Sequence, residues 1–185
     1  CYQVVTDQWV SGFSIGGTYE DKVGVVWLDR MTTTNIQGYG TWLIGFDTLY
    51  VTNCDSYNNF DANDTDPGNT ADGFTIGSAT STPDTANILY MSGNRSWGNA
   101  DDAFEISPSC QVDIHDNWAF LCGRGNGGGG AFKFRHGYTK MPSKRKIYNN
   151  MAVFTKGIGF FEQNLYDPYG PVAYYYNNFA YQCLY

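Results

Sequence analysis

Ala103-Phe104-Glu105-Ile106 is the stretch that decides the fold, because the chain repeats its pattern of a small, an aromatic, a variable and an apolar residue. The other copies begin at Gly73, Ala131 and Gly159, so the spacings are 30, 28 and 28 residues, and the last copy ends on Glu162 instead of an apolar residue. Repeats of this length are typical of solenoids, in which each repeat forms one coil and buries its inner face against its neighbours.

A second five-residue motif interleaves with the first. Its second residue is Asn in four of five copies, its fourth is always Ser or Ala, and its fifth is aromatic or Val; the copies are 53–57, 93–97, 116–120, 149–153 and 177–181. Each copy lies beside a short run in which apolar and polar residues alternate, such as Val112-Asp113-Ile114, and such alternation indicates a strand. Asn tolerates the left-handed backbone and can bond to the next coil. We therefore predict a β-solenoid with an Asn ladder at one turn, and with the Ser/Ala and aromatic columns pointing inward.

Around this core we expect one domain over residues 1–185, with the repeat core in 43–183. Residues 1–42 would form the first coils or an N-terminal cap, and Val23, Val26 and Trp27 would share one face of a short cap helix over 20–31. Loops are expected at 60–71, 123–130 and 137–145, the second of which is glycine-rich.

The composition limits the class of protein. The 185 residues include 22 Gly and 17% aromatic residues, which suits a β-rich, turn-rich protein.

No apolar run approaches the ~20 residues needed to span a membrane. The five cysteines do not follow a zinc spacing. The net charge of −7 argues against nucleic acid as a partner. We expect a secreted, extracellular or cell-surface protein that starts at Cys1 as a mature form or as a piece of a longer chain.

Acidic residues recur at the start of the first motif. Asp72 precedes one copy, Asp101 and Asp102 precede the next, and Glu105 lies inside it. Adjacent coils are ~4.8 Å apart, so the four carboxylates are expected to converge. A hard cation with 6–8 oxygen ligands, such as Ca²⁺, would relieve their repulsion. The alternative is that some of these acids cap turns or pair with nearby basic residues.

Basic residues concentrate in one strip, because six of the eleven Lys and Arg lie between Lys133 and Lys146, with His136 among them. Lys133 holds the column position of Glu105 one coil further on, which places an ammonium beside the acids. The alternatives are a salt bridge from Lys133 to Glu105 and a solvated basic loop.

These strings resemble the core of the family 9 pectate lyases over roughly residues 43–183. The matching elements are Asn69-Thr70-Ala71-Asp72-Gly73-Phe74, the run from Asn99 to Ile106, Gly130-Ala131-Phe132-Lys133-Phe134, Asn149-Asn150 and Gly159-Phe160. The resemblance implies an all-β, right-handed, single-stranded parallel β-helix, here of about 6–7 short coils. It departs from the family at Glu105, where Asp is expected, and at Ala103 and Ala131, where Gly is expected.

The resemblance also implies a site. The Ca²⁺ ligands would be Asp72, Asp101, Asp102 and Glu105, and Lys133 would be the base that cleaves an acidic, polygalacturonate-like polysaccharide by β-elimination. Ca²⁺ and Arg135 would lower the pKa of Lys133, so an alkaline optimum is expected. The side chains expected to bind the polymer's carboxylates are Arg135, His136, Lys144 and Arg145.

Two other functions are compatible with the residues. A polygalacturonase-type hydrolase would use the paired acids Asp101 and Asp102 with Asp72 and His136-Gly137, and it would need no metal. A non-catalytic solenoid would instead build a filament or surface fibre, or bind carbohydrate, because open sheet edges at both ends favour end-to-end self-association.

Overall fold

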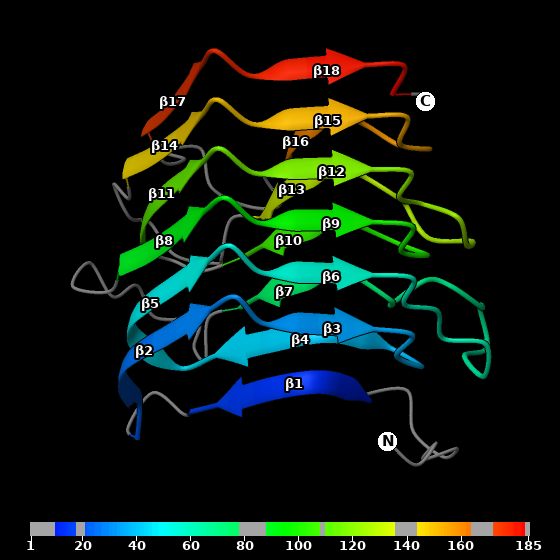
Figure 1. The fold of residues 1–185 in the computed structure, drawn as a ribbon, viewed down its shortest axis with the longest axis horizontal. Coiled ribbons are helices and arrows are strands. Elements are labelled where there is room, and N and C mark those ends of the chain that lie inside the picture. Colours follow the sequence, from blue (N-terminus) through cyan, green and yellow to red (C-terminus); the bar gives the residue numbers. More distant parts are fainter. Residues whose placement is uncertain are drawn as a thin grey trace.

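The chain is a right-handed parallel β-helix of six coils, which confirms the predicted fold class. The computed structural model describes residues 10–17, 21–77, 88–107, 110–135, 144–163 and 172–183. Every coil contributes one strand to each of three parallel sheets, and the coils stack in register along one axis (Figure 1).

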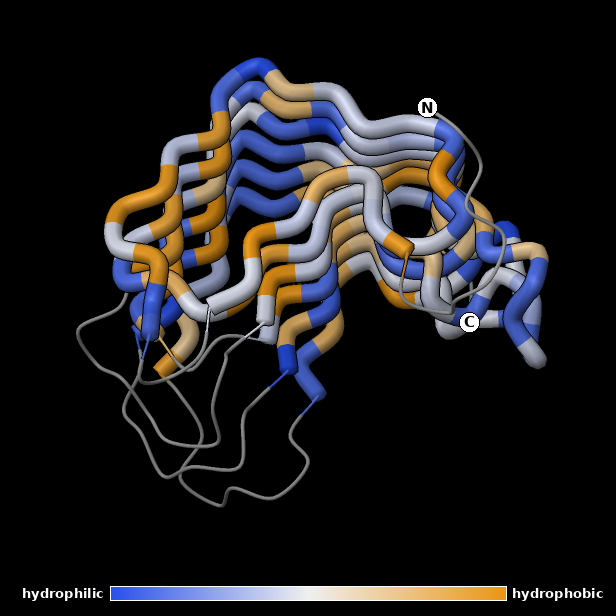
Figure 2. Tube along the Cα trace, turned by 90° about the horizontal axis from the view of Figure 1, so that it is seen from below, coloured by the Kyte–Doolittle hydropathy of each residue, from blue (hydrophilic) through white to orange (hydrophobic). Residues whose placement is uncertain are grey.

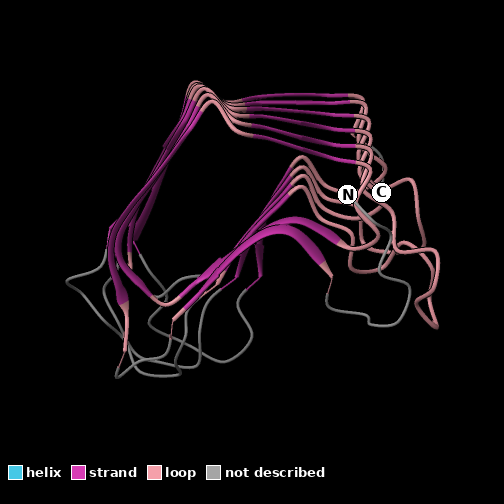
Figure 3. Cartoon of the chain, turned by 60° about the horizontal axis from the view of Figure 1, so that its bottom comes forward, coloured by secondary structure: helices cyan, strands magenta, loops and turns pink. Residues whose placement is uncertain are grey.

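The three sheets are named here A, B and C. Sheet A consists of β1 (Ser11–Gly16), β4 (Tyr39–Ile44), β7 (Phe74–Ile76), β10 (Phe104–Ile106), β13 (Phe132–Arg135) and β16 (Phe160–Gln163). Sheet B consists of β2 (Val23–Asp29), β5 (Phe46–Thr52), β8 (Ile88–Ser92), β11 (Gln111–His115), β14 (Lys144–Tyr148) and β17 (Val172–Tyr176). Sheet C consists of β3 (Thr32–Thr34), β6 (Asp55–Tyr57), β9 (Arg95–Trp97), β12 (Trp118–Phe120), β15 (Met151–Val153) and β18 (Phe179–Tyr181). Figure 3 shows the three walls and the turns between them.

The interior is built from columns of like residues, visible as recurring orange segments in Figure 2. The aromatic residues of the first motif stack as Phe74, Phe104, Phe132 and Phe160, with ring centroids 5.2, 4.7 and 5.0 Å apart. Offset aromatic stacks add to the stabilisation from burial alone. The spacing of the first motif therefore sets the register of sheet A, which carries the candidate site.

The predicted Asn ladder forms at the turn between sheets B and C. Successive amides donate from Asn94 to Asn117, from Asn117 to Asn150 and from Asn150 to Asn178, at 2.8, 3.0 and 3.1 Å. The left-handed backbone belongs to the preceding residue of each copy, as at Asp116 (φ 55°) and Asn149 (φ 54°). The left-handed backbone therefore belongs to the first position of the motif, and the hydrogen bonds of the ladder belong to the second.

Three local predictions are wrong or reach beyond the described residues. Residues 23–29 form strand β2, not a helix, because Val26 and Leu28 alternate with outward residues and pair with β5.

The aromatic column of the second motif points outward, not inward as predicted. Its residues follow an inward Ser or Ala, and neighbours in a strand face opposite sides; the rings of Tyr57 and Trp97 stack on the outside with centroids 4.2 Å apart. Residues 60–71 and 123–130 are loops as predicted, but 144–145 begin β14, and 136–143 lie outside the described residues.

Candidate metal and base site

The candidate site lies on sheet A and at the turn that leads into it. Asp72 comes just before β7, and Asp101 and Asp102 come just before β10. Glu105 pairs in register with Thr75 on one side and with Lys133 on the other. The motif spacing thus brings residues far apart in sequence into one column, as the repeat predicted.

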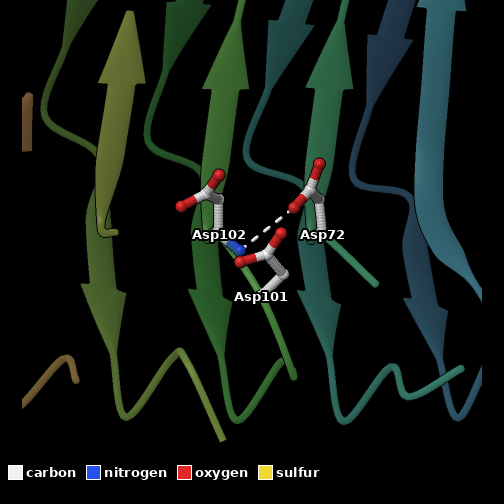
Figure 4. Close-up of side chains that lie close together, drawn as sticks. All are labelled: Asp72, Asp101 and Asp102. Atoms are coloured by element: carbon white, nitrogen blue, oxygen red, sulfur yellow. Dashed lines mark hydrogen bonds between the residues drawn. The ribbon is translucent and has the colours of Figure 1, made fainter. Parts of the chain in front are cut away.

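The three aspartates form a compact buried cluster. Carboxylate oxygens of Asp72, Asp101 and Asp102 lie within 4.8 Å of one another, and no side chain is more than 5% exposed (Figure 4). Oδ1 of Asp72 accepts a 3.0 Å hydrogen bond from the backbone N–H of Asp102, and Oδ2 accepts one of 2.7 Å from the Thr75 hydroxyl. Among the described residues, no ion pair involves Asp72 or Asp101.

Burial and mutual repulsion make these carboxyls hard to ionise together. Burial, followed by the charges of Glu105, Asp102 and Asp101, holds the pKa of Asp72 well above its usual value. Burial and the Asp102 charge raise the pKa of Asp101 to about 7. Burial also raises the pKa of Asp102, although Lys133 opposes this shift. A bound cation would relieve all three shifts, because it favours the charged forms.

Among the residues that the structure describes, Lys133 is the cation that forms an ion pair with this cluster. Its Nζ lies 2.7 Å from Oδ2 of Asp102 and 3.2 Å from Oε2 of Glu105, and its side chain is only 14% exposed. Burial lowers the pKa of Lys133, but the two carboxylates outweigh burial and raise it above the usual value. The lowering expected in the presence of Ca²⁺ stays a prediction, because these two carboxylates dominate when no cation is bound. The salt bridge to Glu105, the alternative considered from the sequence, is present.

Glu105 stands apart from the aspartates. It pairs with Lys133 and, at 3.1 Å, with the guanidinium of Arg135. The group whose carboxylate oxygens lie close enough together to hold one metal contains Asp72, Asp101 and Asp102 without it. Three aspartates supply up to six carboxylate oxygens, which matches the all-oxygen ligands that Ca²⁺ prefers. The residues present fit such an ion, although the fourth expected ligand is engaged elsewhere.

The four residues predicted to bind the polymer have four different placements. Arg135 joins the site through Glu105 and remains partly exposed. Lys144 is exposed at the first position of β14, in sheet B, and His136 lies outside the described residues.

Arg145 does not fit its predicted role of binding the polymer, because it is 1% exposed and points into the coil. It donates 2.7 and 3.3 Å hydrogen bonds to the Arg135 carbonyl and to Glu162. The alternation of β14 explains this placement, since Lys144 and Lys146 take the outward positions.

The glycine-rich loop 123–130 is the part of the site that the sequence reasoning missed. The Gly129 N–H donates to Oδ1 of Asp101 at 2.8 Å, and the Gly130 N–H donates to Oδ1 of Asp102 at 2.6 Å. A Cβ on Gly127 would lie 2.2 Å from Oδ1 of Asp101. The signal was the run of glycines one coil after the paired aspartates, which permits the backbone to approach side chains closely.

Comparison of the chain with protein-family models, with curated proteins and with solved structures found no match. In the part of the chain that the structure describes, no helix of a length and apolarity suited to crossing a membrane occurs.

Proposed function

We propose that this chain is a calcium-dependent polysaccharide lyase that cleaves an acidic, uronate-containing polymer by β-elimination, with Lys133 as the base. The observation that carries the proposal is the position of Lys133, whose Nζ lies 2.7 Å from a carboxylate of the buried Asp72, Asp101 and Asp102 cluster. A lysine beside an all-oxygen metal site is a combination that can remove a proton next to a carboxylate, because the amine can act as the base and the metal can stabilise the developing charge.

The residues would act in distinct roles. Asp72, Asp101 and Asp102 would hold the cation, and the Gly129 and Gly130 N–H groups fix two of these carboxylates in place. When bound, Ca²⁺ supplies a positive charge that stabilises the developing charge on the substrate carboxylate. Arg135, which is 39% exposed, is available to bind a second carboxylate of the polymer.

Lys133 would take the proton from C5 of the uronate as the bond from C4 to the glycosidic oxygen breaks. The electron pair left at C5 forms the double bond between C4 and C5, and the leaving oxygen takes a proton from water. For this step the amine must be neutral. Burial and the neighbouring Arg135 both lower the pKa of Lys133, and they prevail once a cation balances the charges of Asp102 and Glu105.

The test is the ultraviolet absorbance of the unsaturated uronate product. Polygalacturonate would be incubated at alkaline pH with Ca²⁺, and again with a chelator. Absorbance that grows only with Ca²⁺ is the expected result. No absorbance and no cleavage of any uronate polymer would overturn the proposal.

A polygalacturonase-type hydrolase is the second candidate, and the raised pKa of Asp101 is the observation that favours it, because a glycosidase needs one protonated carboxyl. The same assay separates the two reactions. Hydrolysis creates new reducing ends without the absorbance of a double bond, and it persists in chelator.

A further inference from the structure

The turns that lead from sheet C to sheet A repeat one left-handed backbone position in successive coils. Its occupants are Asn58 (φ 56°), Gly98 (φ 65°), Leu121 (φ 53°) and Phe154 (φ 55°), and the N–H of each donates to a backbone carbonyl of the next coil. Asn and Gly adopt this backbone readily, whereas a bulky residue adopts it with strain. Leu121 and Phe154 are therefore unusual occupants of a position that Asn and Gly fill in the two preceding coils.

The side chains of these two residues are also exposed, at 48% for Leu121 and 42% for Phe154. Both lie in turns that have a described turn of the same kind on either side, because Gly98 precedes Leu121 and Gln182 follows Phe154 in the column. The neighbouring turns therefore leave the two side chains uncovered. Strained backbone positions cluster at sites that hold ligands, so strain together with exposure indicates a role beyond packing.

A cavity lies against these two turns. Its volume is about 570 Å³, and its lining consists of residues 121–124, residues 154–156 and Gln182. A volume of this size lies within the range of small-molecule sites in proteins. The exposed surfaces of Leu121 and Phe154 therefore border a space that a small ligand can fill.

The charged residues of the lining are both basic. Arg124 and Lys156 are exposed, and no ion pair among the described residues involves either of them. Nζ of Lys156 donates a 2.8 Å hydrogen bond to the Gly125 carbonyl, which holds this ammonium beside the turn that carries Arg124. An anionic group complements the two cations, and an apolar body complements the rest of the lining.

We propose that this cavity binds a small organic carboxylate with an aromatic body. The carboxylate pairs with Arg124 and Lys156, and the ring packs against Phe154 and Leu121. This inference is independent of the proposed lyase activity, because neither the aspartate cluster nor Lys133 lines the cavity.

The surroundings of Phe154 favour an aromatic body over an aliphatic one. Its ring makes edge contacts with Phe120 and Tyr181, with ring centroids 5.9 and 5.7 Å apart. Aromatic rings in such arrangements attract one another beyond the effect of burial alone. A ligand ring would extend this group of rings on the exposed side of Phe154.

The test is an NMR titration of the ¹⁵N-labelled protein with trans-cinnamate, a small aromatic carboxylate. Saturable shifts are expected at the amides of residues 121–124 and 154–156, with a Kd below about 1 mM. Cinnamamide has the same body without the charge, and acetate has the charge without the body. Each should bind at least about tenfold more weakly than cinnamate, because each lacks one half of the contacts. Galacturonate, which has a carboxylate on a polar body, should also bind more weakly.

Variants separate the two halves of the site. Arg124→Gln and Lys156→Gln should each weaken cinnamate binding by about threefold to tenfold. Lys146→Gln is the matched control, since Lys146 is an exposed cation on β14 in sheet B and should leave binding unchanged. Leu121→Gly and Phe154→Asn remove the apolar surface but place at each turn a residue that suits its left-handed backbone. We expect both variants to fold, as circular dichroism and the melting temperature would show, and to lose cinnamate binding.

Four outcomes would overturn the proposal. The first is the absence of saturable shifts at these amides, and the second is cinnamamide binding as tightly as cinnamate. The third is a folded Phe154→Asn variant that binds cinnamate as the wild type does. The fourth is tighter binding of galacturonate than of cinnamate at the same amides, because the cavity would then belong to the polymer site.

Discussion

Nζ of Lys133 lies 2.7 Å from Oδ2 of Asp102, although 31 residues separate them in the sequence. Asp102 is almost fully buried, and the same carboxylate group belongs to the cluster that could hold a metal. Lysine and a cation would therefore act on one carboxylate. Without a cation, the ammonium balances part of the cluster's negative charge; under the proposed function, a bound cation would take over that charge and leave the amine to act as the base.

Replacement of Lys133 tests the base directly. Lys133→Ala is expected to lower the elimination rate by about 10²–10⁴-fold, the usual contribution of a general base. Lys133→Arg should be equally inactive, because a guanidinium does not deprotonate in proteins. Lys146→Ala, exposed on β14, is the matched control and should retain activity. The measurement is product absorbance under saturating Ca²⁺, and full activity in Lys133→Ala would exclude this residue as the base.

The stability of the metal-free protein should fall as the pH rises from about 4 to about 7. The pKa of Asp101 is about 7 in the folded protein against an ordinary value of 3.8, and that of Asp72 is raised as well. Between these values the folded state binds protons that the unfolded state lacks, so raising the pH favours unfolding. Thermal melting in chelator checks the slope, and Asp101→Asn should flatten it.

Calcium should reverse this loss. The ion competes with protons for the aspartates, so added Ca²⁺ is expected to raise the melting temperature at about pH 8 and to have much less effect at about pH 5. Asp47→Asn, a change at an exposed strand position, should leave the response to calcium unchanged. A melting temperature that does not respond to Ca²⁺ at either pH would contradict the assignment of the metal site.

Asn117 should be the most sensitive position of the Asn ladder. Its amide donates to Met91, His115 and Asn150, and its Oδ1 accepts from Asn94. Asn117→Ala leaves several buried groups without partners, at about 1–3 kcal/mol each, so we expect a loss of unfolding free energy of at least about 2 kcal/mol. Denaturant titration is the measurement. Asn63→Ala, at an exposed loop position, should change stability by less than about 0.5 kcal/mol.

The repeat made the solenoid, its sheet A register and the placing of Lys133 beside Glu105 predictable from sequence. In-register stacking follows from spacing alone, because like positions of successive coils must meet. The inward position of Arg145 follows from the same repeat, because Arg145 stands five residues before Asn150 as the buried Val112 stands before Asn117. Its residue type instead favoured a surface role, since a charged side chain is seldom fully buried. The ion pair from Arg135 to Glu105, and the place of Glu105 outside the compact aspartate group, depend on side-chain geometry that no spacing encodes.

The glycine-rich loop offers the sharpest test of the aspartate cluster, because two adjacent glycines differ in the space around them. A Cβ on Gly127 would lie 2.2 Å from Oδ1 of Asp101, whereas a Cβ on Gly128 would meet nothing within 4 Å. Gly127→Ala must therefore displace the Asp101 carboxylate, although it removes no acidic residue from the chain. We expect it to weaken Ca²⁺ binding by at least about tenfold, which corresponds to about 1.4 kcal/mol. Gly128→Ala should bind Ca²⁺ as the wild type does. Titration calorimetry with Ca²⁺ alone measures both, and equal affinities for the two variants would show that Asp101 does not bind the ion.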